Sequence, residues 1–277
     1  MNKILLLFSL MIGSTIACKA QEGYQISGKV DGIADGKILL VSEESGKLDT
    51  LATTLINNGV FIFTGKVNQP LAAYLMLENG GGVVPLILEN VNFMVNISST
   101  GALIQGGKQQ EIFNLFSRNN MKLLQTQNRI QQEFQQAEQT GNKNRMQTLR
   151  KQFEEAVINA RQEEEQLLKQ YADSYVAAYV VAVGARQFEL KTLKIRYGLL
   201  GDSAKATIPG RFVAELIADM EQFEEGYVVP DFTVTTQVGD SLSLYPVKGK
   251  LKLVVFWEST DSLCREENVN LLDIYQK

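Results

Sequence analysis

Few side chains in this chain could carry out chemistry. Among its 277 residues there is no histidine, and the two cysteines are Cys18 and Cys264. Without an imidazole the chain has no Ser–His or Cys–His nucleophile pair and no imidazole general base, and nearly all ordinary zinc sites are excluded. The composition therefore argues against a hydrolase or a zinc enzyme. Thiol chemistry remains, and Cys264 is the sole thiol if Cys18 is lipidated or removed.

Cys18 lies at the end of a segment typical of a secretory signal. A basic residue, Lys3, precedes the apolar run 4–12, which is too short to span a membrane. Thr15–Cys18 resembles the lipobox of bacterial lipoproteins, although Thr15 stands where that motif usually has leucine, whereas Cys18–Ala20 would suit ordinary signal peptidase. We favour lipid attachment at Cys18, keep the second interpretation open, and expect export to the periplasm or cell envelope.

Cys264 lies in a segment whose pattern predicts a strand, a loop and a helix in that order. Leu251–Trp257 is a nearly continuous apolar run, typical of a strand that is covered on both faces. We expect a loop over Glu258–Cys264 and a helix over Arg265–Tyr275. Before the run, Thr233–Thr235 should begin a hairpin that turns at Gly239–Asp240.

Two resemblances follow from short motifs. The C-terminal part of the chain resembles the opening of a thioredoxin-like thiol-disulfide oxidoreductase of the membrane-tethered or periplasmic type. The motifs that carry this resemblance are Pro230–Phe232, Gly239–Leu244, Gly249–Lys250, Val254–Trp257 and Cys264–Glu267. The N-terminal part resembles the β-rich domain of unknown function that precedes such modules in secreted proteins of gut-dwelling Gram-negative bacteria. The motifs here are Ile26–Val30, Gly59–Phe63 and Gln69–Leu71.

The first resemblance implies specific roles for the residues around Cys264. In that family Cys-x-x-Cys begins a helix, whose N-terminus lowers the pKa of the attacking thiol, and the second thiol resolves the mixed disulfide. Here Asp261 stands at the attacking position and Cys264 at the resolving one. The sequence ends at Lys277, soon after the first helix of that module. We therefore expect a truncated, degenerate and non-catalytic segment in which Asp261 caps the helix and Leu251–Trp257 lacks strand neighbours on one side.

Alternative functions remain open at this stage. A thiol-disulfide oxidoreductase or peroxide-reducing antioxidant protein could act through Cys264, alone or with a partner's thiol, so whether the chain is an enzyme stays undecided. The β-rich domain could bind a glycan or peptide through Tyr74 or Phe93, although alternating strands place aromatic residues in cores more often. The net charge of −4 argues against nucleic-acid binding. No cofactor or metal is expected, and the partner is unknown apart from a membrane reached through a lipid on Cys18.

The elements that position these residues predict an α+β fold in four parts: a signal segment over 1–20, a β-rich domain over 21–106, a helical connector over 107–225 and the truncated thioredoxin-like segment over 226–277. In the β-rich domain, alternating residues between turns predict an antiparallel sandwich or open barrel. The expected strands are Tyr24–Val30, Lys37–Val41, Val60–Phe63, Ala73–Leu77, Val83–Leu88 and Val91–Val95.

The connector is expected to be helical because glycine and proline nearly vanish after Gly107. A long antiparallel hairpin should turn at Thr140–Asn142, and its Phe113, Phe116 and Phe153 should pack against the sheet or the partner helix. The acidic run Glu163–Glu165 is interpreted as a solvated helix exterior. Shorter helices are expected near Tyr175–Val183, Phe188–Tyr197 and Arg211–Phe223.

Overall fold

The computed structural model describes residues 22–44, 47–78 and 82–276. The chain forms two compact units, Met1–Glu221 and Gln222–Lys277, and the β-rich and helical parts share the first of them. Cys18 and the expected signal segment lie outside the described residues. Within the described part of the chain, no helix combines the length and the apolar character needed to cross a membrane.

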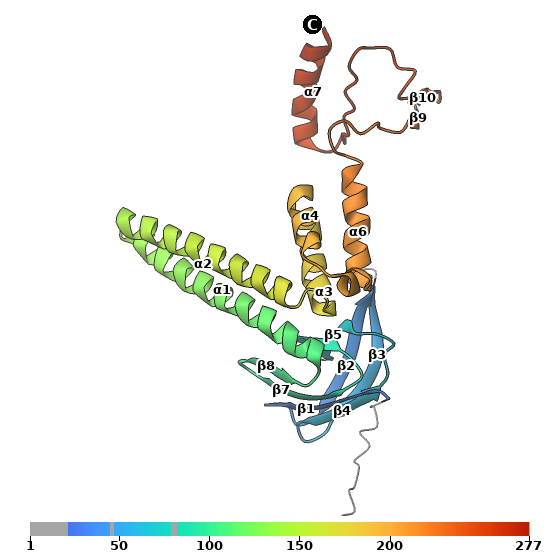
Figure 1. The fold of residues 1–277 in the computed structure, drawn as a ribbon. Helices are drawn as coiled ribbons and strands as arrows, with labels where there is room; N and C mark the ends of the chain where they lie inside the picture. Colours follow the sequence, from blue (N-terminus) through green and yellow to red (C-terminus); the bar gives the residue numbers. More distant parts are fainter. Residues whose placement is uncertain (1–21, 45–46, 79–81, 277) are drawn as a thin grey trace, which may run out of the picture. The chain divides into compact units, whose positions relative to one another are not determined.

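Two four-stranded sheets pack face to face in the first unit (Figure 1). Their strand orders are β4-β1-β7-β8 and β3-β2-β5-β6. The strands are β1 (Tyr24–Val30), β2 (Gly36–Glu44), β3 (Lys47–Ile56), β4 (Val60–Gly65), β5 (Leu71–Leu77), β6 (Val83–Leu88), β7 (Asn92–Ser98) and β8 (Gly101–Gln105). The predicted α+β class is therefore confirmed, and the described strands form an open sandwich and no closed barrel.

The core of the sandwich consists of residues that alternate along the strands toward the opposite sheet. Ile26, Phe61 and Phe93 from the first sheet meet Leu40 and Leu86 from the second. Phe93 is only 1% exposed, so it is a core residue and cannot present a ring to a glycan or peptide. The burial of every second residue explains why most of these strands could be predicted from alternation alone.

The ladders between strands are antiparallel with one exception. β1 pairs with β7 in parallel, with Ile26 opposite Phe93. After β4 the chain crosses to the other sheet and forms β5 and β6 there. It then returns to the first sheet as β7, which lies beside β1 and runs in the same direction. Two strands, β3 and β8, were not predicted.

The helices follow the sandwich in the chain and begin with a long hairpin. They are α1 (Lys108–Gln139), α2 (Lys143–Gln170), α3 (Tyr175–Val183), a 3-10 turn at Ala185–Gln187, α4 (Leu190–Gly198), α5 (Asp202–Lys205) and α6 (Ile208–Glu221). The expected turn at Thr140–Asn142 is confirmed, and the Asn142 side chain caps α2 by accepting from the Arg145 N–H at 3.0 Å. The shorter helices agree with prediction to within a few residues.

A second core joins the helices to the sandwich. Val176, Leu193 and Val213 from α3, α4 and α6 pack together with Ile87 from β6. Phe116 is buried in this core and Phe113 packs against it, while Phe153 packs in a smaller cluster between α1 and α2. The predicted packing of these three rings is confirmed, with Phe116 buried and the other two partly buried.

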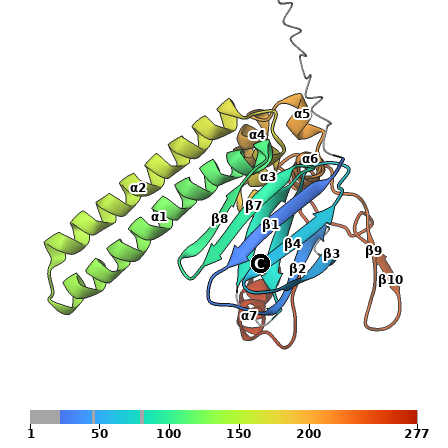
Figure 2. The same ribbon diagram turned by 90° about the horizontal axis from the view of Figure 1, so that it is seen from below.

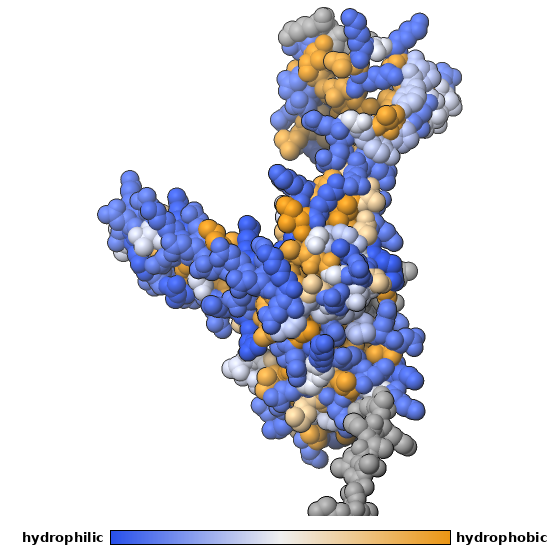
Figure 3. All heavy atoms as spheres, in the orientation of Figure 1, coloured by the Kyte–Doolittle hydropathy of each residue, from blue (hydrophilic) through white to orange (hydrophobic). Residues whose placement is uncertain are grey.

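The outer surface of the hairpin is polar, as Figure 3 shows for the face in view. Glu163 and Glu165 are exposed and lie within ion-pair distance of Lys122 and Lys169, in agreement with a solvated exterior. Glu164 differs because its carboxylate meets Arg196 of α4 at 2.5 Å in a partly buried position. The acidic run is thus mostly solvent-facing, with one member that links α2 to α4.

The first turns of α1 attach it to one edge of each sheet. Gln110 is 1% exposed, and its Oε1 accepts the outward N–H of Ile87 on β6 at 2.7 Å. Its Nε2 donates to Asn114 Oδ1 at 2.8 Å, and Asn114 Nδ2 donates to the Ile104 carbonyl on β8 at 2.9 Å. Two amides one turn apart therefore satisfy backbone groups of β6 and β8.

The Gln110→Ala variant should lower the free energy of unfolding by about 1–3 kcal/mol, because the buried Ile87 N–H loses its acceptor. Urea unfolding at neutral pH measures this. Gln132→Ala on the exposed face of the same helix is the matched control and should change stability by less than about 0.5 kcal/mol. Equal losses in the two variants would contradict the role assigned to Gln110.

The far end of the hairpin should show a pH-dependent contribution to stability. Hydrogen bonds from Arg129 and from Arg145 hold the pKa of the partly exposed Glu133 below its ordinary value. Because the folded-state pKa is lowered, the stabilisation is present above the unfolded-state pKa and is lost as the pH falls through the folded-state value. Arg145 lies on α2, so the ionised carboxylate links the two helices.

Glu133→Gln should therefore destabilise the chain at neutral pH and match the parent at a pH below the lowered pKa of Glu133. Urea unfolding at both pH values checks this, and added salt should shrink the neutral-pH difference because the pair is exposed. Glu138→Gln serves as control, since no ion pair joins Glu138 to another described residue. A difference that persists unchanged in acid would argue against the ion pair as its source.

Candidate functional site

The segment that carries Cys264 lies in the second unit, which begins with a short hairpin. The predicted turn is confirmed: β9 (Thr233–Thr235) pairs with β10 (Ser241–Ser243) around it. Asp231 Oδ1 accepts the Tyr245 N–H at 2.9 Å and so closes the base of the hairpin. This contact gives the aspartate of the Pro230–Phe232 motif a structural role.

The prediction of a buried strand over Leu251–Trp257 is wrong. These residues form no ladder with any described strand, and Leu251 and Phe256 are 93% and 91% exposed. A strand with this apolar pattern needs neighbouring strands, and the described part of this unit supplies none that pairs with the run. Lys252 secures the start of the run, because its Nζ donates to the Leu244 and Tyr245 carbonyls at 2.9 and 2.8 Å.

The helix after this run begins earlier than predicted. α7 spans Ser262–Gln276, so Cys264 lies in its first turn and not in the preceding loop. Asp261 precedes the helix, and its Oδ1 accepts the N–H of Leu263 at 2.8 Å and that of Cys264 at 3.4 Å. This is the capping arrangement expected of Asp261, and it places a carboxylate at the positive end of the helix dipole.

Cys264 is a half-buried free thiol. The Cys264 backbone N–H donates to Asp261 Oδ1 at 3.4 Å, so the structure brings these two predicted residues together. Cys18, the third, lies outside the described residues. In the described chain, no second cysteine stands near Cys264, and no group of His, Cys, Asp or Glu side chains could hold a metal ion. The arrangement can offer one nucleophilic sulfur and one carboxylate, but no dithiol.

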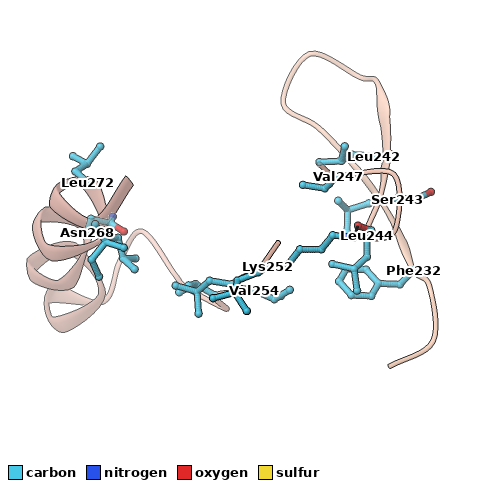
Figure 4. A pocket seen from close by; sticks show the side chains of 15 residues that line it. Phe232, Leu242, Ser243, Leu244, Val247, Lys252, Val254, Asn268 and Leu272 are labelled. Atoms are coloured by element: carbon cyan, nitrogen blue, oxygen red, sulfur yellow. Dashed lines mark hydrogen bonds between the residues drawn. The ribbon is translucent and has the colours of Figure 1, made fainter. Parts of the chain in front are cut away.

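An apolar groove of about 820 Å³ lies within the same unit. Figure 4 shows that its labelled lining residues come from three segments: Phe232 and Leu244 near the hairpin, Val254 in the exposed run, and Asn268 and Leu272 on α7. Apolar side chains gather on this unit in Figure 3. Sequence reasoning did not find the groove, and the only signal was the apolar run that lacks strand partners.

The comparisons with known proteins concern the sandwich. The profile of a family described as a domain of unknown function (DUF4369) matches residues 24–113, which run from β1 into α1. No curated protein and no solved structure matches the chain. The matched region agrees with the β-rich domain of unknown function inferred from the sequence. It does not reach Asp261 or Cys264, so the thioredoxin-like resemblance of the second unit stays a prediction.

Proposed function

We propose that this chain is an exported protein of the cell envelope whose residues 226–277 are related to thioredoxin-like thiol-disulfide oxidoreductases but do not catalyse disulfide exchange. The observation that supports the proposal is the position of Asp261. Its carboxylate accepts the N–H groups of Leu263 and Cys264 at the helix start, where the family that the segment resembles has its attacking sulfur.

The chemistry of exchange explains why this position matters. A thiolate attacks a substrate disulfide, forms a mixed disulfide and releases one substrate thiolate. A second thiol of the enzyme must then attack the mixed disulfide, release the other substrate thiol and leave an oxidised Cys–Cys pair. A carboxylate cannot form a sulfur–sulfur bond, so Cys264 alone could form only a mixed disulfide with no internal route out of it.

The alternative is an oxidoreductase or peroxide-reducing protein in which Cys264 works with a thiol supplied by a partner. The placement of Cys264 in the first turn of α7 favours this idea, because helix N-termini stabilise anions. In this chain the Asp261 carboxylate already accepts the exposed N–H groups of that turn. We therefore place the alternative second.

Export is the other part of the proposal. It rests on the basic and apolar pattern of residues 1–20 and on the lipobox-like Thr15–Cys18. A lipid on Cys18 would hold the protein at a membrane surface, whereas ordinary cleavage would release it into the periplasm. Both routes place the described units outside the cytoplasm.

The purified chain without residues 1–20 should not accelerate insulin reduction by dithiothreitol above the rate of its Cys264→Ser variant, because one thiol cannot complete the cycle. Turbidity of the released insulin B chain is the measurement. Turnover above the Cys264→Ser control would overturn the non-catalytic assignment and favour the oxidoreductase alternative.

Asp261→Cys is the informative second variant in the same preparation. If the helix start keeps the geometry of a Cys-x-x-Cys site, mild oxidation should convert both thiols of this variant to an internal disulfide, visible as loss of thiol titre and of two hydrogen atoms by mass. Ser259→Cys, placed outside the helix start, is the matched control and should keep its thiols reduced for longer. Similar oxidation of both variants would argue against the proposed relationship.

Protein isolated from membranes of the native cell should have lost the residues before Cys18 and should carry a diacylglyceryl group on that cysteine, as intact-mass measurement would reveal. A Cys18→Ser variant should lose the lipid and leave the membrane fraction. Protein that begins at Met1 would contradict export. Protein that begins after Ala20 without lipid would support the ordinary signal-peptidase interpretation.

A further inference from the structure

The sandwich has an open edge beside a groove. β8 is the last strand of the β4-β1-β7-β8 sheet, and Figure 2 shows it next to α1. A groove of about 860 Å³ lies between them and is lined by Ala102–Gln105 from the strand, by Gly106 after it and by one face of α1 from Lys108 to Met121. Gly106 and Gly107 join the two elements, both with positive φ. A side chain at Gly106 would collide with the Asn92 carbonyl, so this tight junction requires glycine.

The direction of each backbone group on β8 follows from its pairing. Ser98 lies opposite Gly101 across a two-residue turn, and Asn96 lies opposite Leu103. Residues of an antiparallel strand alternate in the side to which their N–H and C=O point. The Ile104 carbonyl bonds to Asn114 of α1, which shows that Ile104 and therefore Ala102 point away from β7.

α1 satisfies this edge only in part. The Asn114 side chain donates to the Ile104 carbonyl, but within the described residues nothing bonds to the outward N–H and C=O of Ala102. Ala102 and Ile104 both line the groove. Unpaired backbone groups that point from a strand edge into a groove are complementary to another extended chain, which can exchange both hydrogen bonds with Ala102. A helix could not do this, since its backbone groups are bonded internally.

The side chains around the groove define the chemistry of such a chain. Leu115, Met121 and Tyr171 supply apolar surface. Lys108 and Arg118 are exposed cations that form no ion pair with a described carboxylate, and the groove contains one acid, Glu111. The local charge is therefore positive, although the whole chain has a net charge of −4. This favours an acidic ligand over a second copy of the chain.

We propose that this groove binds an extended peptide segment with alternating apolar side chains and a carboxylate, which adds a strand to β8 at Ala102. The backbone of the peptide pairs with Ala102, its apolar side chains lie against Leu115 and Met121, and its carboxylate meets Arg118 or Lys108. The Ile104 carbonyl is occupied and Gly101 faces Ser98 on β7, so Ala102 is the residue of β8 that pairs with the peptide backbone.

Fluorescence anisotropy with three synthetic probes tests the proposal on the chain without residues 1–20. The first probe is a labelled ten-residue peptide of alternating Val and Thr with one central Asp, the second replaces that Asp by Lys, and the third carries N-methyl groups on alternate backbone nitrogens. We expect saturable binding of the Asp probe. The Lys probe and the N-methylated probe should each bind about tenfold more weakly, since they lose a charged contact or backbone donors.

Ala102→Pro removes the outward N–H without altering the bonds to β7 and should weaken the Asp probe about tenfold. Ala102→Val is the matched control, because it keeps the N–H and should bind like the parent. Arg118→Gln should weaken the Asp probe about fivefold and leave the Lys probe unchanged or tighter. Circular dichroism establishes that the variants are folded.

Several results would overturn the proposal. They are absence of saturable binding to the Asp probe, equal affinity of the N-methylated probe, or undiminished binding to a folded Ala102→Pro variant. If Ala102→Pro does not fold, the N-methylated probe decides alone. Dimerisation in sedimentation experiments that Arg118→Gln abolishes, without binding of any probe, would assign the edge to a second copy of the chain and would also refute the proposal.

Discussion

The structure of the first unit depends on how one helix closes the open side of a β-sandwich. One pair of edge strands, β3 and β4, is joined by the turn at Asn57–Gly59. The other pair, β6 and β8, meets α1 instead. One edge offers an N–H at Ile87 and the other a C=O at Ile104. A primary amide has both a donor and an acceptor, so Gln110 and Asn114 can bond to each edge and to each other. Neither a carboxylate nor an ammonium group could do both.

This attachment fixes more than the edge. The N-cap residue of α1 is Gly107, which has no side chain to cap the helix. Glu89, just after β6, supplies the cap instead, because its Oε1 accepts the Gln109 N–H at 2.8 Å. The Gln109 side chain in turn accepts the Val176 N–H at the start of α3 at 3.3 Å. Strand, hairpin and short helices are thus joined through consecutive polar contacts, beside an apolar core shared by β6 and the helices. The same constraint holds the groove open, because α1 covers β8 at Ile104 and leaves Ala102 free.

The elements that could be predicted from sequence are those whose evidence is local. Alternation identified β1 to the residue, the short apolar run Val83–Leu88 did the same for β6, and the Asp261 cap followed from contacts that span two or three positions. β3 escaped because most of its large apolar side chains are exposed, Leu55 to 61%, and only Ile56 at its end is fully buried. β8 escaped because the four residues between Gly101 and Gly106 carry little periodicity. The Gln110 and Asn114 contacts depend on which strands end at the edges, and no single sequence states that.

The error at Leu251–Trp257 is instructive because the pattern itself was real. Burial of apolar surface is favourable by about 25 cal/mol per Å². A layer that covers the run with Leu251 and Phe256 would therefore stabilise it. Sequence pattern reports what a segment can bury and not whether a neighbour is present. The Asp261 cap is independent of that neighbour, since its bonds are to Leu263 and Cys264 of the same turn.

The two candidate surfaces therefore carry different kinds of information. The groove beside α7 is lined mainly by apolar side chains, which favour any apolar ligand. Its lining therefore says little about the identity of that ligand. The groove beside β8 has a fixed donor and acceptor at Ala102 and exposed cations at Lys108 and Arg118, which specify a conformation and a charge. Directional polar groups define a partner more narrowly than apolar area does. For that reason we propose a binding role for the sandwich edge, whereas for the second unit the structure shows only that the Asp261 carboxylate caps α7 beside Cys264.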